Sequence, residues 1–285
     1  MPVTQSEHGR RGKLSVPERP EQTGAHGFDL GQALGDHVLS VWCIGVRSQV
    51  QQLHRGMITE MNEKNAARPV RVWDLPTRFF HWSLVVLLVV AWSTAQAGLE
   101  WMTYHLWAGY SILALLLFRL MWGFLGAPTA QFGSFIARPG VAWRYARELA
   151  AGRHAVYVGH NPLGGYMVFL LLLLVLIQVV TGLFSTDDIL VSGPLADRVP
   201  RQYSRWATGV HKVNINILIA AVAVHVGAIG FYRWRFGDNL VLPMVTGKKL
   251  LSDEVAPHQG EASPWRAAGL LLISVVAVYL VVSCL

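Results

Sequence analysis

Four histidines lie in long apolar segments of the chain, and their spacing suggests the chemistry they could support. They are His81, His105, His211 and His225. His211 and His225 are 14 residues apart. In an α-helix this is about 3.9 turns and about 21 Å of rise, so both imidazoles face nearly the same direction at different depths. An ionisable side chain inside a membrane is costly and usually functional, so we treat all four as candidate site residues.

The segments that must position these histidines are apolar enough to cross a membrane. Of the 285 residues, 53% are hydrophobic and only 14% are charged. Runs rich in Leu, Val and Ala without sustained alternation predict helices rather than a membrane barrel, and about 20 apolar residues span a bilayer. The predicted spans are Phe79–Ala97, Tyr104–Leu125, Leu163–Phe184, Ala207–Tyr232 and Ala267–Leu285. The predicted fold class is an all-α integral membrane protein, with a bundle of four transmembrane helices and a fifth, C-terminal transmembrane helix.

The basic residues between the spans predict the orientation. Lys and Arg gather before the first span, between the second and third, and after the fourth. The connection 98–103 has none, and the connection after the third span mixes three arginines with three aspartates. By the positive-inside rule the N-terminus is cytoplasmic and the C-terminus lies outside. The net charge of +7 therefore reflects membrane flanks, and nucleic-acid binding is not expected.

This orientation pairs the histidines by depth. His81 lies near the cytoplasmic start of its span with His225, whereas His105 and His211 lie near the outer face. A single histidine could serve packing or a proton relay, but four at two shared depths favour two metal centres, each held by one pair. Pairs about 21 Å apart cannot form a single four-histidine site. We therefore predict two haem groups, His81/His225 holding an inner one and His105/His211 an outer one.

The cysteines limit the type of haem. Only Cys43 and Cys284 occur, both remote from the histidine spans, and no C-x-x-C-H motif is present. Covalent c-type attachment, an iron–sulfur cluster and a cysteine zinc site are therefore not expected. The prediction is two non-covalent b-type haems.

Two basic residues are further cofactor-binding candidates. Arg119 follows His105 by 14 residues and so shares its face, at the depth of the inner pair. A haem propionate would supply the counter-charge that a buried Arg needs; the alternative is that Arg119 snorkels to the inner head groups. Lys212 could serve the outer haem or be exposed to solvent. Three other histidines are expected to be solvated loop residues: His154, His160 and His258.

Composition also suggests domain boundaries. Residues 1–67 are polar and are interpreted as a disordered extension or as the result of a misassigned start, with Met57 and Met61 as alternative starts. Residues 68–250 form the predicted haem domain, whose first helix begins near Asp74 and Pro76, a capping residue and a first-turn proline. Residues 251–285 comprise a linker and the fifth helix, whose expected role is packing or anchoring.

Several motifs around these residues resemble a known family. They are R-V-W-D-L-P-T-R-F-F-H-W around His81, Y-H-L-W-A-G-Y around His105, R-L-M-W-G-F-L-G from Arg119, N-P-L-G-G-Y from Asn161, and G-V-H-K-V-N through A-V-H-V-G-A from Gly209. Over residues 71–250 the chain is similar to the bacterial cytochrome b561 and nickel–iron hydrogenase b-type cytochrome family. The resemblance implies a four-helix core with two b haems in the bacterial inner membrane, passing electrons between the quinone pool and a partner.

Two functions stay open at this point. The first is an electron-transfer subunit of a respiratory chain that links quinone or quinol to a periplasmic c-type cytochrome or to a hydrogenase- or dehydrogenase-like module. The alternative is a self-contained superoxide:quinone oxidoreductase. That enzyme would need a positively charged outer entrance, for which Lys212, Arg201 and Arg205 are candidates, although three nearby aspartates oppose them. No catalytic triad or nucleotide-binding loop is visible, so the first interpretation is preferred.

Overall fold

The computed structural model describes residues 47, 49–57, 68–251 and 262–284. Residues 47 and 49–57 are helical, and the rest of the predicted N-terminal extension lies outside the described residues. The elements from residue 68 onward are all in one unit, Met61–Leu285. They are β1 (Arg68–Arg71), α2 (Leu75–Ala97), α3 (Met102–Leu125), α4 (Phe132–Phe135), α5 (Pro139–Ala150), α6 (Pro162–Phe184), α7 (Arg201–Phe236), α8 (Val241–Thr246), β2 (Lys248–Leu251) and α9 (Pro264–Cys284), with short 3₁₀ turns at Leu99–Trp101, Pro128–Ala130 and Ala196–Arg198.

The described helices confirm the predicted all-α membrane fold. Five of them, α2, α3, α6, α7 and α9, are long and apolar enough to cross a membrane. Each begins one to six residues before the span expected from hydropathy. In α2, α3, α7 and α9 the first turn also contains polar residues that a purely apolar window leaves out. At α2 the Asp74 carboxylate accepts a hydrogen bond of 3.0 Å from the Thr77 backbone N–H, which is the expected N-cap. Helix α7 has 36 residues and, at about 54 Å, is longer than a bilayer is thick.

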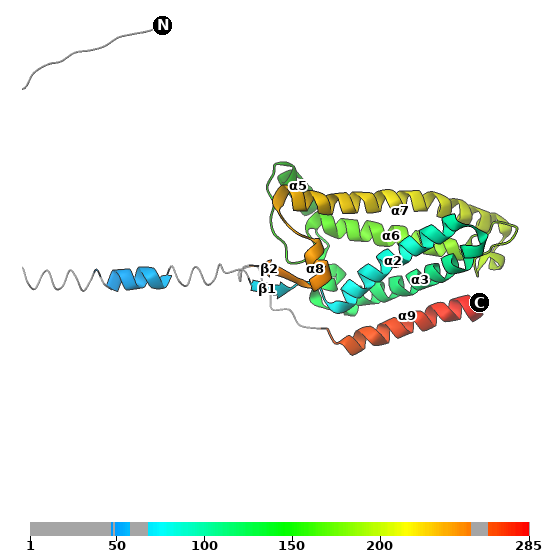
Figure 1. Ribbon diagram of the computed structural model, residues 1–285, viewed down its shortest axis with the longest axis horizontal. Coiled ribbons are helices and arrows are strands. Elements are labelled where there is room, and N and C mark those ends of the chain that lie inside the picture. The colour runs from blue at the N-terminus through cyan, green and yellow to red at the C-terminus, as the bar shows by residue number, and fades with distance from the viewer. Residues whose placement is uncertain (1–46, 48, 58–67, 252–261, 285) are drawn as a thin grey trace, which may run out of the picture. The chain divides into compact units, whose positions relative to one another are not determined.

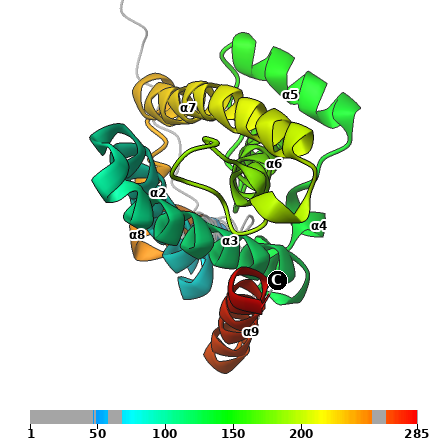
Figure 2. The ribbon, with the colours of Figure 1, turned by 90° about the vertical axis from the view of Figure 1, so that its right-hand side faces the viewer.

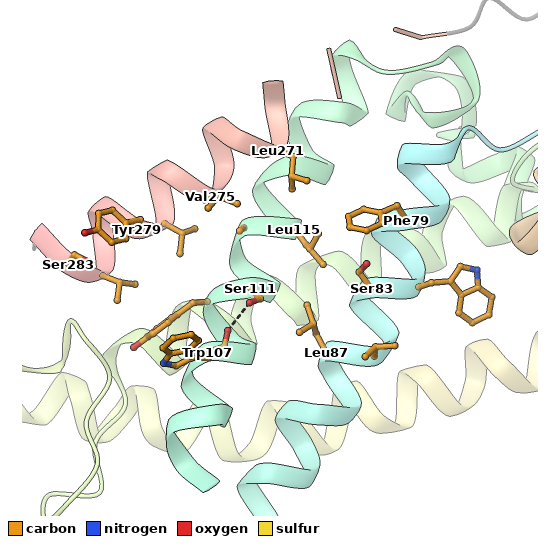
Figure 3. A pocket seen from close by; sticks show the side chains of 16 residues that line it. Phe79, Ser83, Leu87, Trp107, Ser111, Leu115, Leu271, Val275, Tyr279 and Ser283 are labelled. Carbon is orange, nitrogen blue, oxygen red and sulfur yellow. Dashed lines mark hydrogen bonds between the residues drawn. The ribbon is translucent and has the colours of Figure 1, made fainter. Parts of the chain in front are cut away.

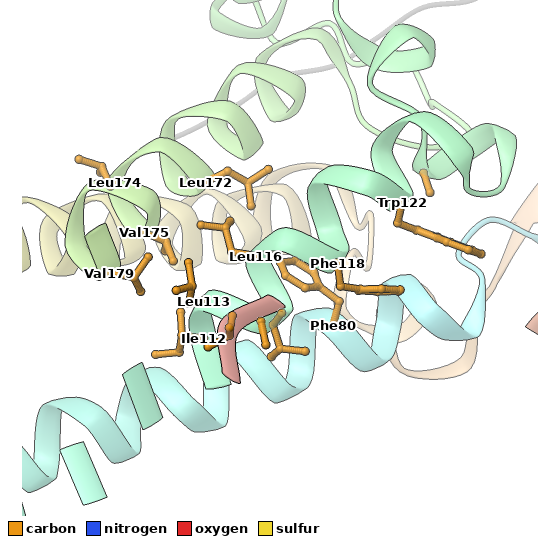
Figure 4. Packing of buried hydrophobic residues seen from close by; sticks show 14 of the residues in the cluster. Phe80, Ile112, Leu113, Leu116, Phe118, Trp122, Leu172, Leu174, Val175 and Val179 are labelled. Carbon is orange, nitrogen blue, oxygen red and sulfur yellow. The ribbon is translucent and has the colours of Figure 1, made fainter. Parts of the chain in front are cut away.

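Four of the long helices form a bundle, seen along its axis in Figure 2. The strongest contacts are between α6 and α7, between α2 and α3, and between α3 and the outlying α9. The core lies between α3 and α6, where Leu116 and Phe118 approach Leu172 and Val175 and where Phe80 of α2 joins them (Figure 4). Helices α2 and α7 add little to this core: 11% of the apolar stretch of each is buried, against 56% for the second span, which contains α3.

A small antiparallel sheet, not predicted from the sequence, joins the two ends of the segment 68–251. Strand β1 pairs with β2 so that Arg68 lies opposite Leu251 and Arg71 opposite Lys248. We call the end of the bundle next to this sheet the sheet end, and the end next to residues 98–101 and 185–200 the loop end; both appear in Figure 1. Helices α2 and α6 begin at the sheet end, and α3 and α7 begin at the loop end.

A groove of about 830 Å³ lies between α2, α3 and α9. It is lined mainly by apolar and aromatic side chains, among them Phe79, Trp107 and Tyr279, which Figure 3 shows projecting from the three helices. None of the four candidate histidines lines it. The groove is therefore separate from the site described next.

Candidate functional site

The histidine pair at the loop end is brought together by α3 and α7. His105 lies in the first turn of α3 and His211 lies on α7. Their ring centres are 6.2 Å apart, and the ring planes are nearly perpendicular at 84°. Because a metal–imidazole bond is about 2 Å long, two imidazoles bound to opposite sides of one metal ion have ring centres about 6 Å apart. The separation therefore fits two ligands of one iron.

Backbone carbonyl groups orient both rings of this pair. The Nδ1 atom of His105 lies 2.8 Å from the Ala91 carbonyl oxygen, and that of His211 lies 2.9 Å from the Gln178 carbonyl oxygen. Each Nδ1–H donates to its carbonyl, which leaves the Nε2 lone pair available; this is the usual arrangement of a metal-binding histidine. Gly182 lies against the His211 ring, where an added Cβ would be only 3.1 Å from Cε1.

Two side-chain amides, of Gln178 and Asn214, lie next to the Nε2 atom of His211. The Gln178 side-chain amide is 3.1 Å from His211 Nε2 and donates to it. Asn214, itself buried, donates to Gln178 Oε1 at 2.7 Å and to the Leu174 carbonyl at 2.9 Å. The amide therefore occupies the lone pair that a metal would use, and the Gln178 side chain must turn away for His211 to bind iron.

The second pair lies toward the sheet end. His81 is in the second turn of α2 and His225 is on the last third of α7. The two rings are close enough for their charges to interact, although α2 and α7 make little direct contact along their described lengths. The Nδ1 atom of His81 is buried and has no hydrogen-bond partner. The structure thus places His105 beside His211, and it brings His81 and His225 within range of each other's charge.

Buried polar atoms without partners are concentrated at the sheet end. Among the described residues such side-chain atoms are Thr77 Oγ1, Arg78 Nε, His81 Nδ1, Arg119 Nη1 and His160 Nδ1. The first three lie in the first two turns of α2, Arg119 is near the end of α3, and His160 immediately precedes the Asn161 cap of α6. Buried polar groups are normally hydrogen-bonded, so such a cluster calls for an explanation. Four of the five are nitrogen atoms, which suits a ligand that carries acceptor groups.

Arg119 is buried inside the bundle, at 3% exposure. Its guanidinium lies 4.8 Å from the centre of the Phe132 ring, and this burial argues against snorkelling to the head groups. The Asp74 carboxylate is near enough to attract the positive charge of Arg119. However, no carboxylate in the described part of the chain lies within 4 Å of the Arg119 guanidinium, the distance that defines an ion pair. The two Asp74 oxygens instead accept from the Thr77 backbone N–H and, at 2.9 Å, from Trp122 Nε1. Arg119 therefore keeps an unmet donor next to a nearby but otherwise engaged carboxylate.

Lys212, the other basic candidate, is exposed on α7. Its backbone carbonyl accepts a 3.0 Å hydrogen bond from the Asn216 side chain. Adjacent residues of a helix point about 100° apart, so Lys212 faces away from the direction of His211. The described contacts do not bring Lys212 to the histidine pair.

The expectation that His154 and His160 are solvated loop residues is wrong. His160 packs between Trp73 and Phe135, with ring-centre distances of 4.7 Å and 4.6 Å. Burial, followed by the positive charges of Arg119 and His225, lowers the pKa of His160 to about 3, so it is neutral at pH 7. The position of His160 one residue before the Asn161 cap is the one signal in the sequence that could have placed it at the bundle. His258 lies outside the described residues.

His154 belongs to a polar network at the same end of the bundle. Its Nε2 lies 3.2 Å from the Asp238 carboxylate, which Lys249 also binds at 3.0 Å. The Tyr145 hydroxyl lies 3.4 Å from His154 Nδ1 and 3.0 Å from the Tyr232 hydroxyl. Burial and the hydrogen bond to Tyr232 raise the pKa of Tyr145, which therefore stays protonated. The network ties α5 to the end of α7.

The donor set distinguishes between kinds of metal centre. In the described part of the chain, no group of three or more His, Cys, Asp or Glu residues is placed to hold a metal ion. A zinc site needs at least three protein ligands, which neither histidine pair provides. A haem brings four ring nitrogens of its own and takes its axial ligands from the protein. The two pairs and the unmet donors at the sheet end therefore fit haem with its carboxylate-bearing edge.

Comparison with known families agrees with this chemistry. Comparisons with curated proteins and with solved structures gave no match. The family described as prokaryotic cytochrome b561 matches residues 72–247, which include all four histidines, Arg119 and His160. Because the match covers more than half of the 285 residues, this multi-pass membrane protein, a b-type cytochrome of electron transfer, belongs to the prokaryotic cytochrome b561 family.

Proposed function

We propose that the protein is a di-haem cytochrome that carries electrons across the bacterial inner membrane between the quinone pool and a redox partner. The partner would be a periplasmic c-type cytochrome or a hydrogenase- or dehydrogenase-like module. The observation that carries the proposal is the presence of two histidine pairs at opposite ends of one bundle. His211 and His225 are separated by about 21 Å along α7, so two centres would together reach across most of the hydrocarbon layer.

The role of each side chain follows from its surroundings. His105 and His211 would bind the outer haem and His81 and His225 the inner one. The Ala91 and Gln178 carbonyls orient the His105 and His211 rings through Nδ1, and the Gln178 side chain would turn away from His211 Nε2. Each haem supplies a one-electron carrier whose potential is tuned by ligands, burial and hydrogen bonds. Arg119 would contribute a buried positive charge beside the inner haem. We further propose residues 68–250 as the haem domain and 251–285 as a linker with an accessory helix.

The distribution of charge supports an orientation with the sheet end in the cytoplasm. The basic residues near that end include Arg68, Arg71, Arg78, Arg138, Arg144, Arg147, Arg153, Arg233, Arg235, Lys248 and Lys249. At the loop end, Arg201 and Arg205 each donate to Asp188 at 2.7 Å. Because these two arginines share one aspartate, the positive charge of that end is reduced. The positive-inside rule then favours a cytoplasmic sheet end and a periplasmic C-terminus.

The same ion pairs disfavour a superoxide:quinone oxidoreductase. That activity needs a positive entrance at the outer face to attract an anion. Of the candidates Lys212, Arg201 and Arg205, the two arginines are bound to Asp188, and their hydrogen bonds and charge hold the pKa of that carboxyl below its ordinary value. We therefore prefer electron transfer to a separate partner.

The test is the haem content and the grouping of single histidine variants. Full-length protein purified in detergent should contain two acid-extractable haems per chain, with low-spin spectra. His81→Ala and His225→Ala should remove one spectral component, and His105→Ala and His211→Ala the other. One haem per chain, or a grouping of His81 with His211, would refute the proposal. Electron flow from quinol to an external acceptor should stop in all four variants while the remaining haem is still reduced by dithionite.

A further inference from the structure

We propose that His160, together with Arg119 and Arg78, forms a carboxylate-binding pocket that holds the propionate groups of the inner haem. The proposal rests on the proposed function, because it assumes a haem between His81 and His225. It adds His160, a residue from the segment between α5 and α6, to the residues that position this haem.

The first argument is the fixed orientation of His160. Its ring is held between the rings of Trp73 and Phe135. The next residue, Asn161, is anchored as the N-cap of α6, because its side chain accepts from the Gly164 N–H at 2.7 Å and donates to the Tyr232 hydroxyl at 3.1 Å. The imidazole therefore has little freedom to find another partner for its buried Nδ1 atom. A ring fixed in this way suits a ligand that arrives with its own acceptor.

The second argument is that unmet donors from three separate elements lie at the same end of the bundle. Arg78 uses Nη1 to bind the Val245 carbonyl at 2.6 Å, yet its buried Nε has no partner. Arg119 has an unmet Nη1, and His160 is close enough to Arg119 and His225 to interact with their charges. Arg78 precedes His81 by one turn of α2, so both lie on the same side of that helix.

The third argument is charge. The buried Arg119 and the partly buried Arg78 bring positive charge to the sheet end, while neutral His160 adds a hydrogen bond without further repulsion. Asp74 is the nearby acid, and both of its oxygens already accept hydrogen bonds. A buried cation needs a counter-charge, and carboxylates bound to Arg form strong, charge-assisted hydrogen bonds. The two propionates of a b-type haem supply this chemistry.

The decisive experiment combines a protein variant with a modified ligand. Protein made under haem limitation is reconstituted in detergent with haem b or with its dimethyl ester, which lacks the propionate charges. The inner site, identified by the component that His81→Ala removes, should bind the ester roughly 10- to 100-fold more weakly, the factor expected for hydrogen bonds to a charged group. In His160→Leu the penalty for the ester should be clearly smaller, because part of the interaction is already missing.

Spectroscopy provides a second readout. His160→Leu should shift the propionate bending band of the inner haem in the resonance Raman spectrum, and His160→Asn, which keeps an N–H near the position of Nδ1, should restore it. His154→Leu is the matched control, since it removes another largely buried histidine from the same end and should leave the band unchanged.

The outcomes separate this inference from the proposed function. If the wild-type protein holds no haem at the inner site, the proposed function fails. If it holds two haems but binds the ester and haem b equally well at the inner site, only the propionate pocket is refuted; His81→Ala serves here only to assign the inner component. A pocket for a lipid phosphate would also refute it: His160→Leu would then change the phospholipid retained by the protein and leave the propionate band unaltered.

Discussion

Asp74 connects the start of α2 to the end of α3. Its hydrogen bonds define how much its replacement should lower the free energy of unfolding. One carboxylate oxygen caps α2 through the Thr77 N–H, and the other accepts from the indole of Trp122, which is 0% exposed. Asp74→Ala loses an N-cap, worth about 1 kcal/mol, and leaves a buried indole N–H unsatisfied, at about 1–3 kcal/mol. The expected destabilisation is therefore about 2–4 kcal/mol.

Asp74→Asn separates the contribution of the helix cap from that of the hydrogen bond to Trp122. The amide oxygen can still cap α2, but its NH₂ group would face the Trp122 N–H, a donor against a donor. In a Trp122→Phe background this conflict is absent, so Asp74→Asn should cost less there than in the wild type, by about 1 kcal/mol or more. Asn also removes a negative charge near Arg119, which should raise the midpoint potential of the component lost in His81→Ala.

The assay is equilibrium unfolding in detergent, followed by tryptophan fluorescence and by haem absorbance, with a redox titration of each variant. Asp74→Ala, Asp74→Asn, Trp122→Phe and the two double variants form the cycles. Additive effects of Asp74→Asn and Trp122→Phe would refute the hydrogen bond between the helices. A midpoint shift in the component assigned to His105 and His211 would refute the location of Asp74 at the sheet-end site.

Other variants test other parts of the molecule. Arg119→Leu should lower the potential of the inner component, because a lost positive charge favours the oxidised haem; an equal shift of both components would contradict the assignment. Asn214→Leu should destabilise the protein by about 1–3 kcal/mol, because Gln178 Oε1 loses its donor, and should shift only the outer spectrum. Removal of residues 262–285, which include α9, should leave both haems bound, as haem quantification would show. At the loop end, ion pairs with Arg201 and Arg205 lower the pKa of Asp188. A carboxyl group whose pKa is lowered in the folded state stabilises the fold above the pKa of an unfolded Asp, and this stabilisation is lost as the pH falls through the folded-state pKa. Pepsin should therefore begin to cut residues 185–200 only below about pH 4. Cutting that starts well above this pH would contradict the pairing.

The arrangement of the histidines could be predicted from the sequence because it depends on local geometry. Helix rise and the direction of each span give the depth of every residue, and that depth pairs His81 with His225 and His105 with His211. The same local rules place the Asp74 cap of α2, where the side chain and the N–H it binds are three residues apart. The haem assignment then followed from residue type and from the absence of a C-x-x-C-H motif.

Other features were decided only by contacts between residues far apart in the chain. Asp74 and Trp122, which share a hydrogen bond, are 48 residues apart in the sequence. Arg78 and Val245, which share another, are 167 residues apart. Strands β1 and β2 have four residues each, which is too short for an alternation of apolar and polar residues to reveal them in the sequence. They pair because folding of the bundle brings the two segments together. His160 is in a polar loop that reads as solvated, yet Trp73 and Phe135 enclose it. Local sequence thus determines how deep a residue lies along its helix, whereas the packing of the helices determines which distant residues are in contact and whether water reaches them.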